Sequence, residues 1–167
     1  MTLTERVISS NMIVDVLNVV CEKEDSKKNL AQFNYDSFVE LIKNIEETYD
    51  EDFIYCMPEY LLYKKHLKKI QSEDTVDCLM RNVKSKKIIL CQNDKESDDK
   101  SMIYIALAKE GRILSKDKKL IKHLDKLPLV EKTDAMQFIE ENIMDFHFVD
   151  GEIVIIGLIP KKFKRNT

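Results

Sequence analysis

The sequence predicts an α/β fold in which a mostly parallel central sheet carries helices on both faces and a hairpin is added at the end. Three observations lead to this fold class. Apolar, β-branched runs at residues 11–20 and 87–91 are typical of strands buried on both faces. Segments in which apolar residues recur at helical spacing alternate with these runs. Finally, Asp150-Gly151 separates two strand-like segments, which is a strong hairpin signal.

The individual elements follow from local patterns. Residues 36–47 place apolar side chains on one helical face, with Asp36 as the expected N-cap. Pro58 is suited to open a helix after the strand at 52–57, and Thr133 to cap a later one. In chain order we expect strand 11–20, surface loop 21–34, helix 36–47, strand 52–57, a helix opened by Pro58, helix 73–82, strand 87–91, helix 98–110, a turn at Gly111, strand 112–115, strand 127–130, helix 133–142 and hairpin 146–158.

Length and composition set limits on the class of protein. The 167 residues suit one domain over 1–160, followed by a basic tail at 161–167. Three glycines are too few for the usual nucleotide-binding loops, and the four scattered cysteines favour reduced thiols over disulfides or a zinc site. No apolar run is long enough for a membrane span or a signal peptide. We therefore expect an intracellular protein, cytoplasmic or nuclear, without membrane contact.

Four acidic side chains are expected at the same edge of the sheet. They are Asp15, Asp98, Asp99 and Asp117. The first lies toward the carboxyl end of strand 11–20, the pair begins the helix after strand 87–91, and the last follows strand 112–115. Because the carboxyl ends of parallel strands share one edge, where such sheets bind their ligands, the four carboxylates should converge.

Each acid also has a purely structural interpretation. Asp15 could accept backbone hydrogen bonds at a strand end, and the other three could cap helices. Taken together, however, these interpretations do not explain why four like charges share one edge, where their repulsion requires a cation. A hard divalent ion such as Mg²⁺ or Mn²⁺ prefers carboxylate oxygens. Such an ion would activate a water and neutralise charge on a phosphodiester.

Five segments, in order between residues 11 and 158, resemble a known family. They are MIVDVLNVV, FIYCMPEYLLYKKH, KIILC, SDDKSMIYIALAKEGRILSKDKKL and MDFHFVDGEI. They are similar to a PIN-type ribonuclease domain of the NYN group, closest to the regnase-like endoribonucleases. The resemblance implies a PIN-like three-layer α/β/α sandwich that cleaves single-stranded or stem-loop RNA. It assigns the divalent ion and the attacking water to the four acids, and it places Asn18 and Ser115 along the same cleft. The sequence departs from the family at Val16, where a small residue is usual, and no zinc finger follows.

Basic residues near the acids are the expected phosphate contacts. They are Lys100, Lys116, Lys118, Lys119 and Lys122. Other basic clusters, at 64–65, 68–69, 84–87 and 161–165, are interpreted as solvated helix faces and a tail.

The leading hypothesis is a metal-dependent endoribonuclease with RNA as its partner. Two alternatives stay open: a catalytically inactive PIN-like module that binds RNA or a protein, and a nuclease that acts on DNA. A homodimer also stays open.

Overall fold

The computed structural model describes residues 10–24, 33–92, 97–117, 120, 122 and 132–164, without the side chains of residues 97, 98, 132 and 133. Five parallel strands form the central sheet in the order β3-β2-β1-β4-β5, and β6 and β7 form a separate antiparallel hairpin. The elements are β1 Asn11–Asp15, α1 Val16–Lys23, α2 Tyr35–Thr48, β2 Asp52–Pro58, η3 Glu59–Leu62, α3 Lys64–Leu67, α4 Glu73–Lys84, β3 Ile88–Cys91, α5 Ser97–Lys109, β4 Arg112–Leu114, α6 Lys132–Asn142, β5 Ile143–Met144, β6 Phe146–Val149, β7 Glu152–Ile155 and η5 Lys161–Phe163, where η is a 3-10 helix.

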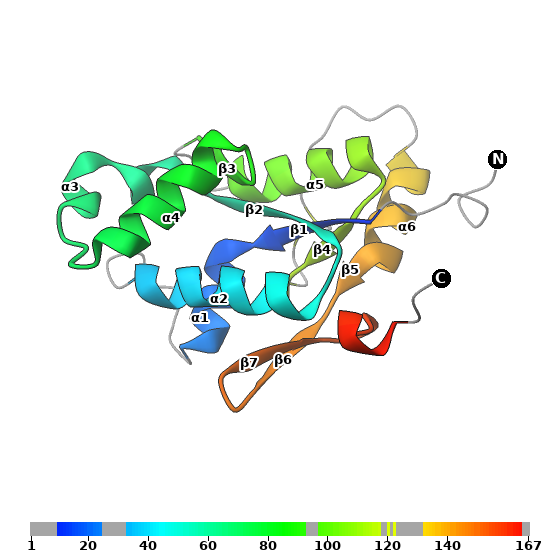
Figure 1. The fold of residues 1–167 in the computed structure, drawn as a ribbon. Coiled ribbons are helices and arrows are strands. Elements are labelled where there is room, and N and C mark those ends of the chain that lie inside the picture. Colours follow the sequence, from blue (N-terminus) through cyan, green and yellow to red (C-terminus); the bar gives the residue numbers. More distant parts are fainter. Residues whose placement is uncertain are drawn as a thin grey trace.

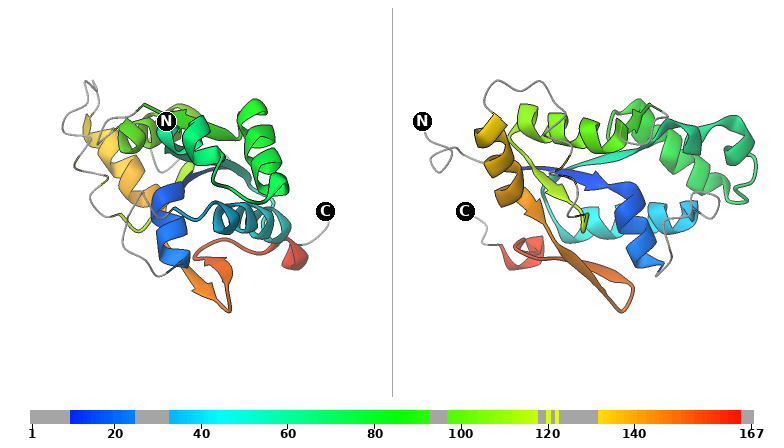
Figure 2. Two further views of the ribbon diagram at one scale, coloured as in Figure 1. Left: turned by 90° about the vertical axis from the view of Figure 1, so that its left-hand side faces the viewer. Right: turned by 180° about the vertical axis from the view of Figure 1, so that it is seen from behind.

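Helices cover both faces of the sheet, which confirms the predicted three-layer α/β/α architecture. One core cluster joins the sheet to α1, α2, α4 and the hairpin, and a second joins it to α5 and α6. Alternation along β1 divides the two clusters, because Met12 and Val14 enter the first and Ile13 enters the second. In Figures 1 and 2, α5 lies on one side of the sheet, and α1 and α2 lie on the other.

The prediction of one strand over residues 11–20 is wrong, because the chain changes from strand to helix at Asp15. β1 ends there and α1 starts at Val16. The side chain of Asp15 accepts the backbone N–H of Asn18 and caps the helix. The buried side chains of α1 are Val16, Leu17, Val19 and Val20. A short apolar run that is buried on every side looks the same in a helix as in a strand, so periodicity could not find this boundary.

Other element boundaries also differ from expectation. The predicted loop at 21–34 begins inside α1, and Asn34 rather than Asp36 caps α2 by accepting the Ser37 N–H. Asp36 instead accepts a 2.6 Å hydrogen bond from Thr75 Oγ1, which links α2 to α4. The helix after Pro58 is two short helices, η3 and α3, separated by an extended Tyr63.

The end of the central sheet differs from the prediction as well. The two-residue strand β5 was not predicted, and it pairs with β4 to complete the sheet. The expected strand at 127–130 and the side chain of Thr133 lie outside the described residues. The remaining predicted strands and helices are present, with ends that shift by one to three residues.

Two turns need the residue types that the sequence has at these positions. A Cβ atom at Gly111 would lie 2.9 Å from the carbonyl oxygen of Asn11, so only glycine lets β4 approach the start of β1 this closely. Asp150 and Gly151 have φ angles of 52° and 80°, which is the conformation of a two-residue hairpin turn. The predicted hairpin is therefore confirmed.

Within the described residues, no helix combines the length and the apolar character needed to cross a membrane.

Candidate active site

The candidate site lies at the carboxyl edge of the parallel sheet. Val14 pairs in register with Leu114, so the residues that follow β1 and β4 leave the sheet side by side. α5 packs across β1, β2, β3 and β4 on one face, and its first turn follows the carboxyl end of β3. The segments that carry the predicted acids are therefore all connected to this one edge.

Asp15 is the buried centre of the arrangement, with only 1% of its surface exposed. Its Oδ2 atom accepts a 2.8 Å hydrogen bond from Ser115 Oγ, and its Oδ1 atom accepts the N–H of Asn18 at 3.5 Å. Ser115 is also buried, and its Oγ accepts the backbone N–H of Asp117 at 3.0 Å. One hydroxyl therefore connects the first predicted acid to the backbone of the last.

Asn18 makes a second connection between the same two segments. Its Oδ1 atom accepts the backbone N–H of Lys116 at 2.8 Å, although the two residues are 98 positions apart. The first turn of α1 is thus attached to the segment that follows β4. The family resemblance placed Asn18 and Ser115 along the cleft, and in the structure both residues hold these two segments together.

Asp99 faces the sheet from α5. Met102, Ile103 and Ala106 are fully buried against the sheet, and Asp99 precedes them by three, four and seven residues, which puts it on the same helix face. It is correspondingly buried, with 9% of its surface exposed. The buried face of α5 therefore carries a carboxylate at its amino-terminal end, and that end lies at the edge where the parallel strands finish. The side chain of Asp98 lies outside the described residues.

A metal site can be judged here by the chemistry of its donors. Among the side chains that the structure describes, no group of three His, Cys, Asp or Glu residues is close enough to hold a metal ion. Three of the four predicted ligands, Asp15, Asp99 and Asp117, belong to that set and do not by themselves form such a group, whereas the side chain of Asp98 does not belong to it. The donors at this edge are carboxylate oxygens, and the carboxylates of Asp15 and Asp99 are buried. Such hard donors fit Mg²⁺ or Mn²⁺.

Val16, the departure from the family pattern, lies in the core. Its side chain is completely buried in the core cluster that includes α2 and β2. The larger residue at this position is therefore accommodated by core packing.

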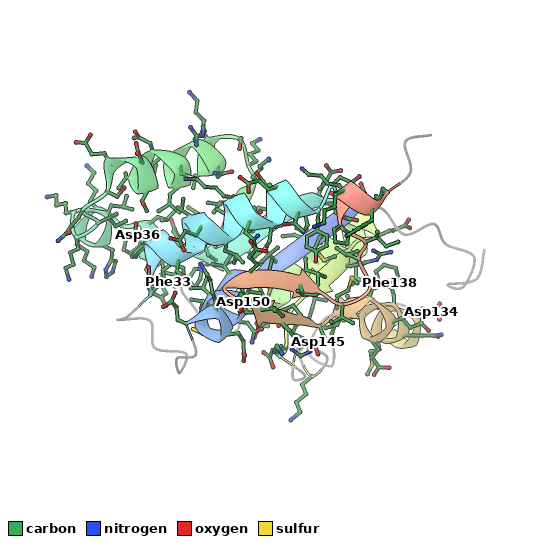
Figure 3. The ribbon with its side chains drawn as sticks, turned by 60° about the horizontal axis from the view of Figure 1, so that its bottom comes forward. Phe33, Asp36, Asp134, Phe138, Asp145 and Asp150 are labelled. Atoms are coloured by element: carbon green, nitrogen blue, oxygen red, sulfur yellow. The ribbon has the colours of Figure 1, made fainter. Side chains whose placement is uncertain are left out.

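The predicted basic residues are only partly described. The Nζ atom of Lys116 lies 3.4 Å from Asp145 Oδ1 and 5.2 Å from the centre of the Phe146 ring. The Phe146 N–H and, secondarily, Lys116 lower the pKa of Asp145, which is labelled in Figure 3 at the junction of β5 and β6. Lys100 is half-buried and Lys122 is exposed, whereas Lys118 and Lys119 lie outside the described residues.

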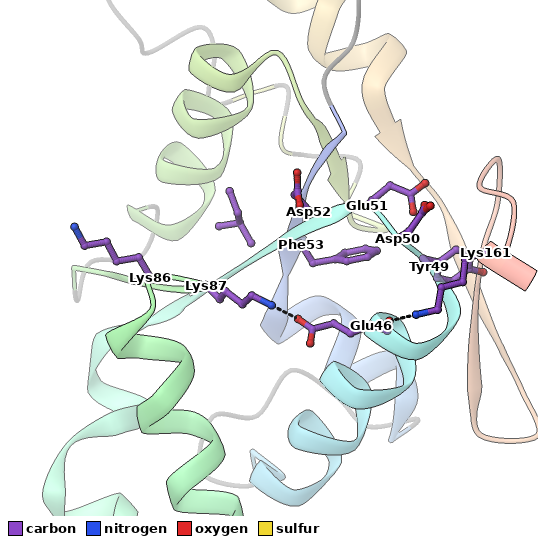
Figure 4. A pocket seen from close by; sticks show the side chains of 10 residues that line it. Glu46, Tyr49, Asp50, Glu51, Asp52, Phe53, Lys86, Lys87 and Lys161 are labelled. Carbon is purple, nitrogen blue, oxygen red and sulfur yellow. Dashed lines mark hydrogen bonds and ion pairs between the residues drawn. The ribbon is translucent and has the colours of Figure 1, made fainter. Parts of the chain in front are cut away.

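A cavity of about 400 Å³ lies at the opposite, amino-terminal edge of the sheet (Figure 4). Two of its lysines contact Glu46: Lys87 forms a 3.0 Å ion pair with the carboxylate, and Lys161 donates a hydrogen bond to the backbone carbonyl. None of the four predicted acids lines this cavity. It is therefore separate from the candidate site.

Comparisons with known proteins identify the fold. No protein-family model matches this sequence, and no curated protein matches it significantly. Two solved structures of the nuclear protein-only RNase P 2 (PRORP2) of Arabidopsis thaliana each align with 97% of this chain, with TM-scores of 0.58 and 0.60 and sequence identities of 16% and 14%. A structure of the PIN domain endonuclease Utp24 aligns with 89% of this chain over 92% of its own length. Its TM-score is only 0.33 and its sequence identity 12%, which is too low to show a shared fold.

The chain spans 32% of the length of the PRORP2 structures. The chain therefore shares its fold, an α/β/α sandwich around a mostly parallel sheet, with the aligned part of the PRORP2 structures. The resemblance to the regnase-like group in particular is not tested by these comparisons and stays a prediction.

Proposed function

We propose that this protein is a metal-dependent endonuclease that hydrolyses phosphodiester bonds in RNA. The observation that carries the proposal is the hydrogen-bonded connection from Asp15 through Ser115 to Asp117, with Asp99 buried at the same edge. A buried carboxylate costs free energy unless it is paired, hydrogen-bonded or bound to a cation. Asp15 is hydrogen-bonded, but a second buried carboxylate at the same edge adds repulsion between like charges, which a bound cation would offset.

The four acids would share the task of holding the ion. Asp15, Asp98, Asp99 and Asp117 are the residues that we assign to Mg²⁺ or Mn²⁺. When bound, the ion supplies a Lewis acid that activates water and neutralises charge on the phosphodiester. Ser115 and Asn18 fix the relative positions of Asp15 and the segment 115–117, so the protein orients its carboxylates before substrate arrives.

RNA is the substrate class that the fold and its neighbours favour. The two PRORP2 structures that align with this chain are of an RNase P. Their sequence identities of 16% and 14% support a shared fold, and RNA as the substrate is our proposal. Of the predicted phosphate contacts, Lys100 lies in the first turn of α5 directly after the acid pair. We propose single-stranded or stem-loop RNA because its backbone can enter an open edge without unwinding.

The test is an RNA cleavage assay with purified protein and a titration of Mg²⁺ or Mn²⁺. Labelled single-stranded and stem-loop RNA should be cut internally, EDTA should stop the reaction, and Asp98→Asn, Asp99→Asn and Asp15→Asn should each abolish it. Asp134→Asn changes the same group on the exposed start of α6 and should leave cleavage intact. Undiminished cleavage in EDTA or in the three site variants would overturn the proposal. DNA of the same sequence separates a ribonuclease from a nuclease of broader specificity.

The second candidate is a non-catalytic module that binds RNA or a protein. The described residues contain no complete metal-binding group, and Lys116 is held by Asp145 rather than offered to a substrate. RNA binding that no divalent ion changes, together with no cleavage under any ion, would favour this candidate.

A further inference from the structure

We infer that residues 59–70, called the basic arm below, bind the phosphate backbone of single-stranded nucleic acid and start from the sheet edge that carries the candidate site. The basic arm contains η3, α3 and the three residues that follow α3. The identity of the ligand depends on the proposed function, but binding by the arm can be measured without any cleavage. From the sequence alone, these lysines are interpreted as part of a solvated helix face.

The first argument is the position of the basic arm. Asp15 pairs in register with Cys56, and β2 ends two residues later at Pro58. The arm therefore starts at the same edge of the sheet as the acids, one strand away from Asp15. Lys64 follows Cys56 by eight positions, so their Cα atoms would lie at most about 29 Å apart even in a fully extended chain. Figure 1 shows α3 at one end of the molecule, beyond β2.

The second argument is unbalanced charge. The arm has four lysines, Lys64, Lys65, Lys68 and Lys69, and one acid, Glu59, which gives a formal charge of +3 in a chain whose total is −3. All four lysines are exposed, and within the described residues none of their ammonium groups has an ion pair or hydrogen bond. In contrast, Lys23, Lys87 and Lys164 each pair with a glutamate. Exposed ammonium groups without an internal partner can neutralise the phosphates of a nucleic-acid backbone.

The third argument is that the arm is held in place. The hydroxyl of Tyr35, in α2, donates a 2.5 Å hydrogen bond to the carbonyl of Leu61, which is itself buried. Consecutive backbone hydrogen bonds, such as Lys68 N–H to the Lys64 carbonyl at 3.0 Å, continue the turns of α3. The lysines therefore project from an ordered support, which reduces the entropy that binding a ligand would cost.

An aromatic side chain completes the surface. Tyr63 lies at the break between η3 and α3, directly before the first two lysines, and 40% of its surface is exposed. Aromatic rings next to cationic side chains are the usual combination in proteins that bind single strands, because the bases stack while the phosphates are neutralised. The basic arm thus fits a single strand better than it fits an acidic protein surface, which offers no bases to stack.

The test measures binding in EDTA, where cleavage cannot contribute. A labelled single-stranded RNA is titrated with the wild type and with a variant that carries Lys64→Gln, Lys65→Gln, Lys68→Gln and Lys69→Gln, at several salt concentrations. The matched control also removes four positive charges from exposed positions, through Lys43→Gln, Lys84→Gln, Lys86→Gln and Lys162→Gln. Circular dichroism and thermal unfolding check that both variants are folded.

We expect the arm variant to bind at least about tenfold more weakly at low salt, and the slope of log K against log salt to fall by about 0.7 for each phosphate that the arm no longer neutralises. An equal weakening in the control variant, or unchanged binding by the arm variant, would overturn the inference. Weaker binding to RNA and single-stranded DNA alike supports backbone recognition. A wild type that binds through the arm but never cleaves would refute the proposed function alone. A wild type that cleaves, with an unchanged KM in the arm variant, would refute the arm alone.

Discussion

The hydroxyl of Ser115 donates a 2.8 Å hydrogen bond to the carboxylate of Asp15, which precedes it by 100 residues. The same oxygen accepts the backbone N–H of Asp117. Two acids that the sequence predicts for one site are thus connected through a single buried hydroxyl. This connection determines how the walls of the site are positioned, and it can be removed without changing any acid.

Replacing Ser115 by alanine should weaken both the fold and the site. Asp15 would keep a buried oxygen without its hydroxyl donor, which costs about 1–3 kcal/mol of unfolding free energy. If the proposed function holds, displacement of the carboxylate should lower kcat by about 100-fold. Denaturant unfolding and single-turnover cleavage measure the two effects. Ser115→Thr keeps the hydroxyl and should recover most of both, and an alanine variant with wild-type stability and rate would contradict the assignment.

Substitutions at Asp15 should separate its structural role from its chemical role. Asn at this position still caps α1, so Asp15→Asn should fold but lose metal-dependent activity. Asp15→Ala loses the cap as well, and should be less stable than Asp15→Asn by about 1 kcal/mol. Thermal unfolding of the two variants, with cleavage measured in parallel, checks the order. Equal stability of both variants would show that the cap contributes nothing.

Metal binding should appear as a gain in stability, independent of catalysis. A ligand that binds only the folded state stabilises it by about 2.7 kcal/mol at 100 times its dissociation constant. We expect Mn²⁺ to raise the Tm of the wild type and to leave that of Asp99→Asn unchanged. Calorimetry with Asp134→Asn supplies the control for a nonspecific charge effect. The same Mn²⁺-induced shift in Asp99→Asn would place the ion elsewhere.

The hydrogen bond from Tyr35 to Leu61, which holds the basic arm, should make the free energy of unfolding depend on pH in the alkaline range. Burial, with a smaller effect of Tyr60, raises the pKa of Tyr35 from 10.0 to about 12. The folded state then keeps a proton that the unfolded state has released, so this stabilisation is complete below pH 10 and disappears as the pH rises toward 12. Tyr35→Phe should flatten that decline, and it should weaken RNA binding through the loosened arm. Unfolding across this pH range, and an RNA titration, test the two consequences.

The contact between Lys116 and Asp145 should change the pKa of Asp145 more than it changes the free energy of unfolding. The Phe146 N–H and Lys116 lower the pKa of Asp145 below 3.8, so any stabilisation is present at neutral pH and disappears as the pH falls through that lowered pKa. Because Asp145 is largely exposed, Asp145→Asn should change the unfolding free energy by less than about 1 kcal/mol. A carboxyl titration by NMR checks the pKa. A normal pKa at Asp145 would show that neither the Phe146 N–H nor Lys116 contacts this carboxylate in solution.

The sequence by itself determined the alternation of strands and helices, the final hairpin, and the edge of the sheet to which the segments that carry the acids lead. These features depend on local patterns: apolar runs such as residues 87–91, the Asp150-Gly151 turn, and acids that follow strands directly. Parallel strands have a common direction, so the order of elements along the chain was enough to predict the edge of the sheet at which the segments that carry the acids lie.

Only the tertiary structure decided how those residues are held. The end of β1 at Asp15 could not be predicted, because a short run buried on every side has the same composition in a helix and in a strand. The hydrogen bonds of Ser115 with Asp15 and of Asn18 with Lys116 span about 100 residues and depend on the register of β1 against β4. Likewise, sequence alone cannot show that Lys116 pairs with Asp145 while the lysines of the basic arm stay exposed. Local patterns place residues along the chain, but packing and register choose the partners that are far apart in sequence.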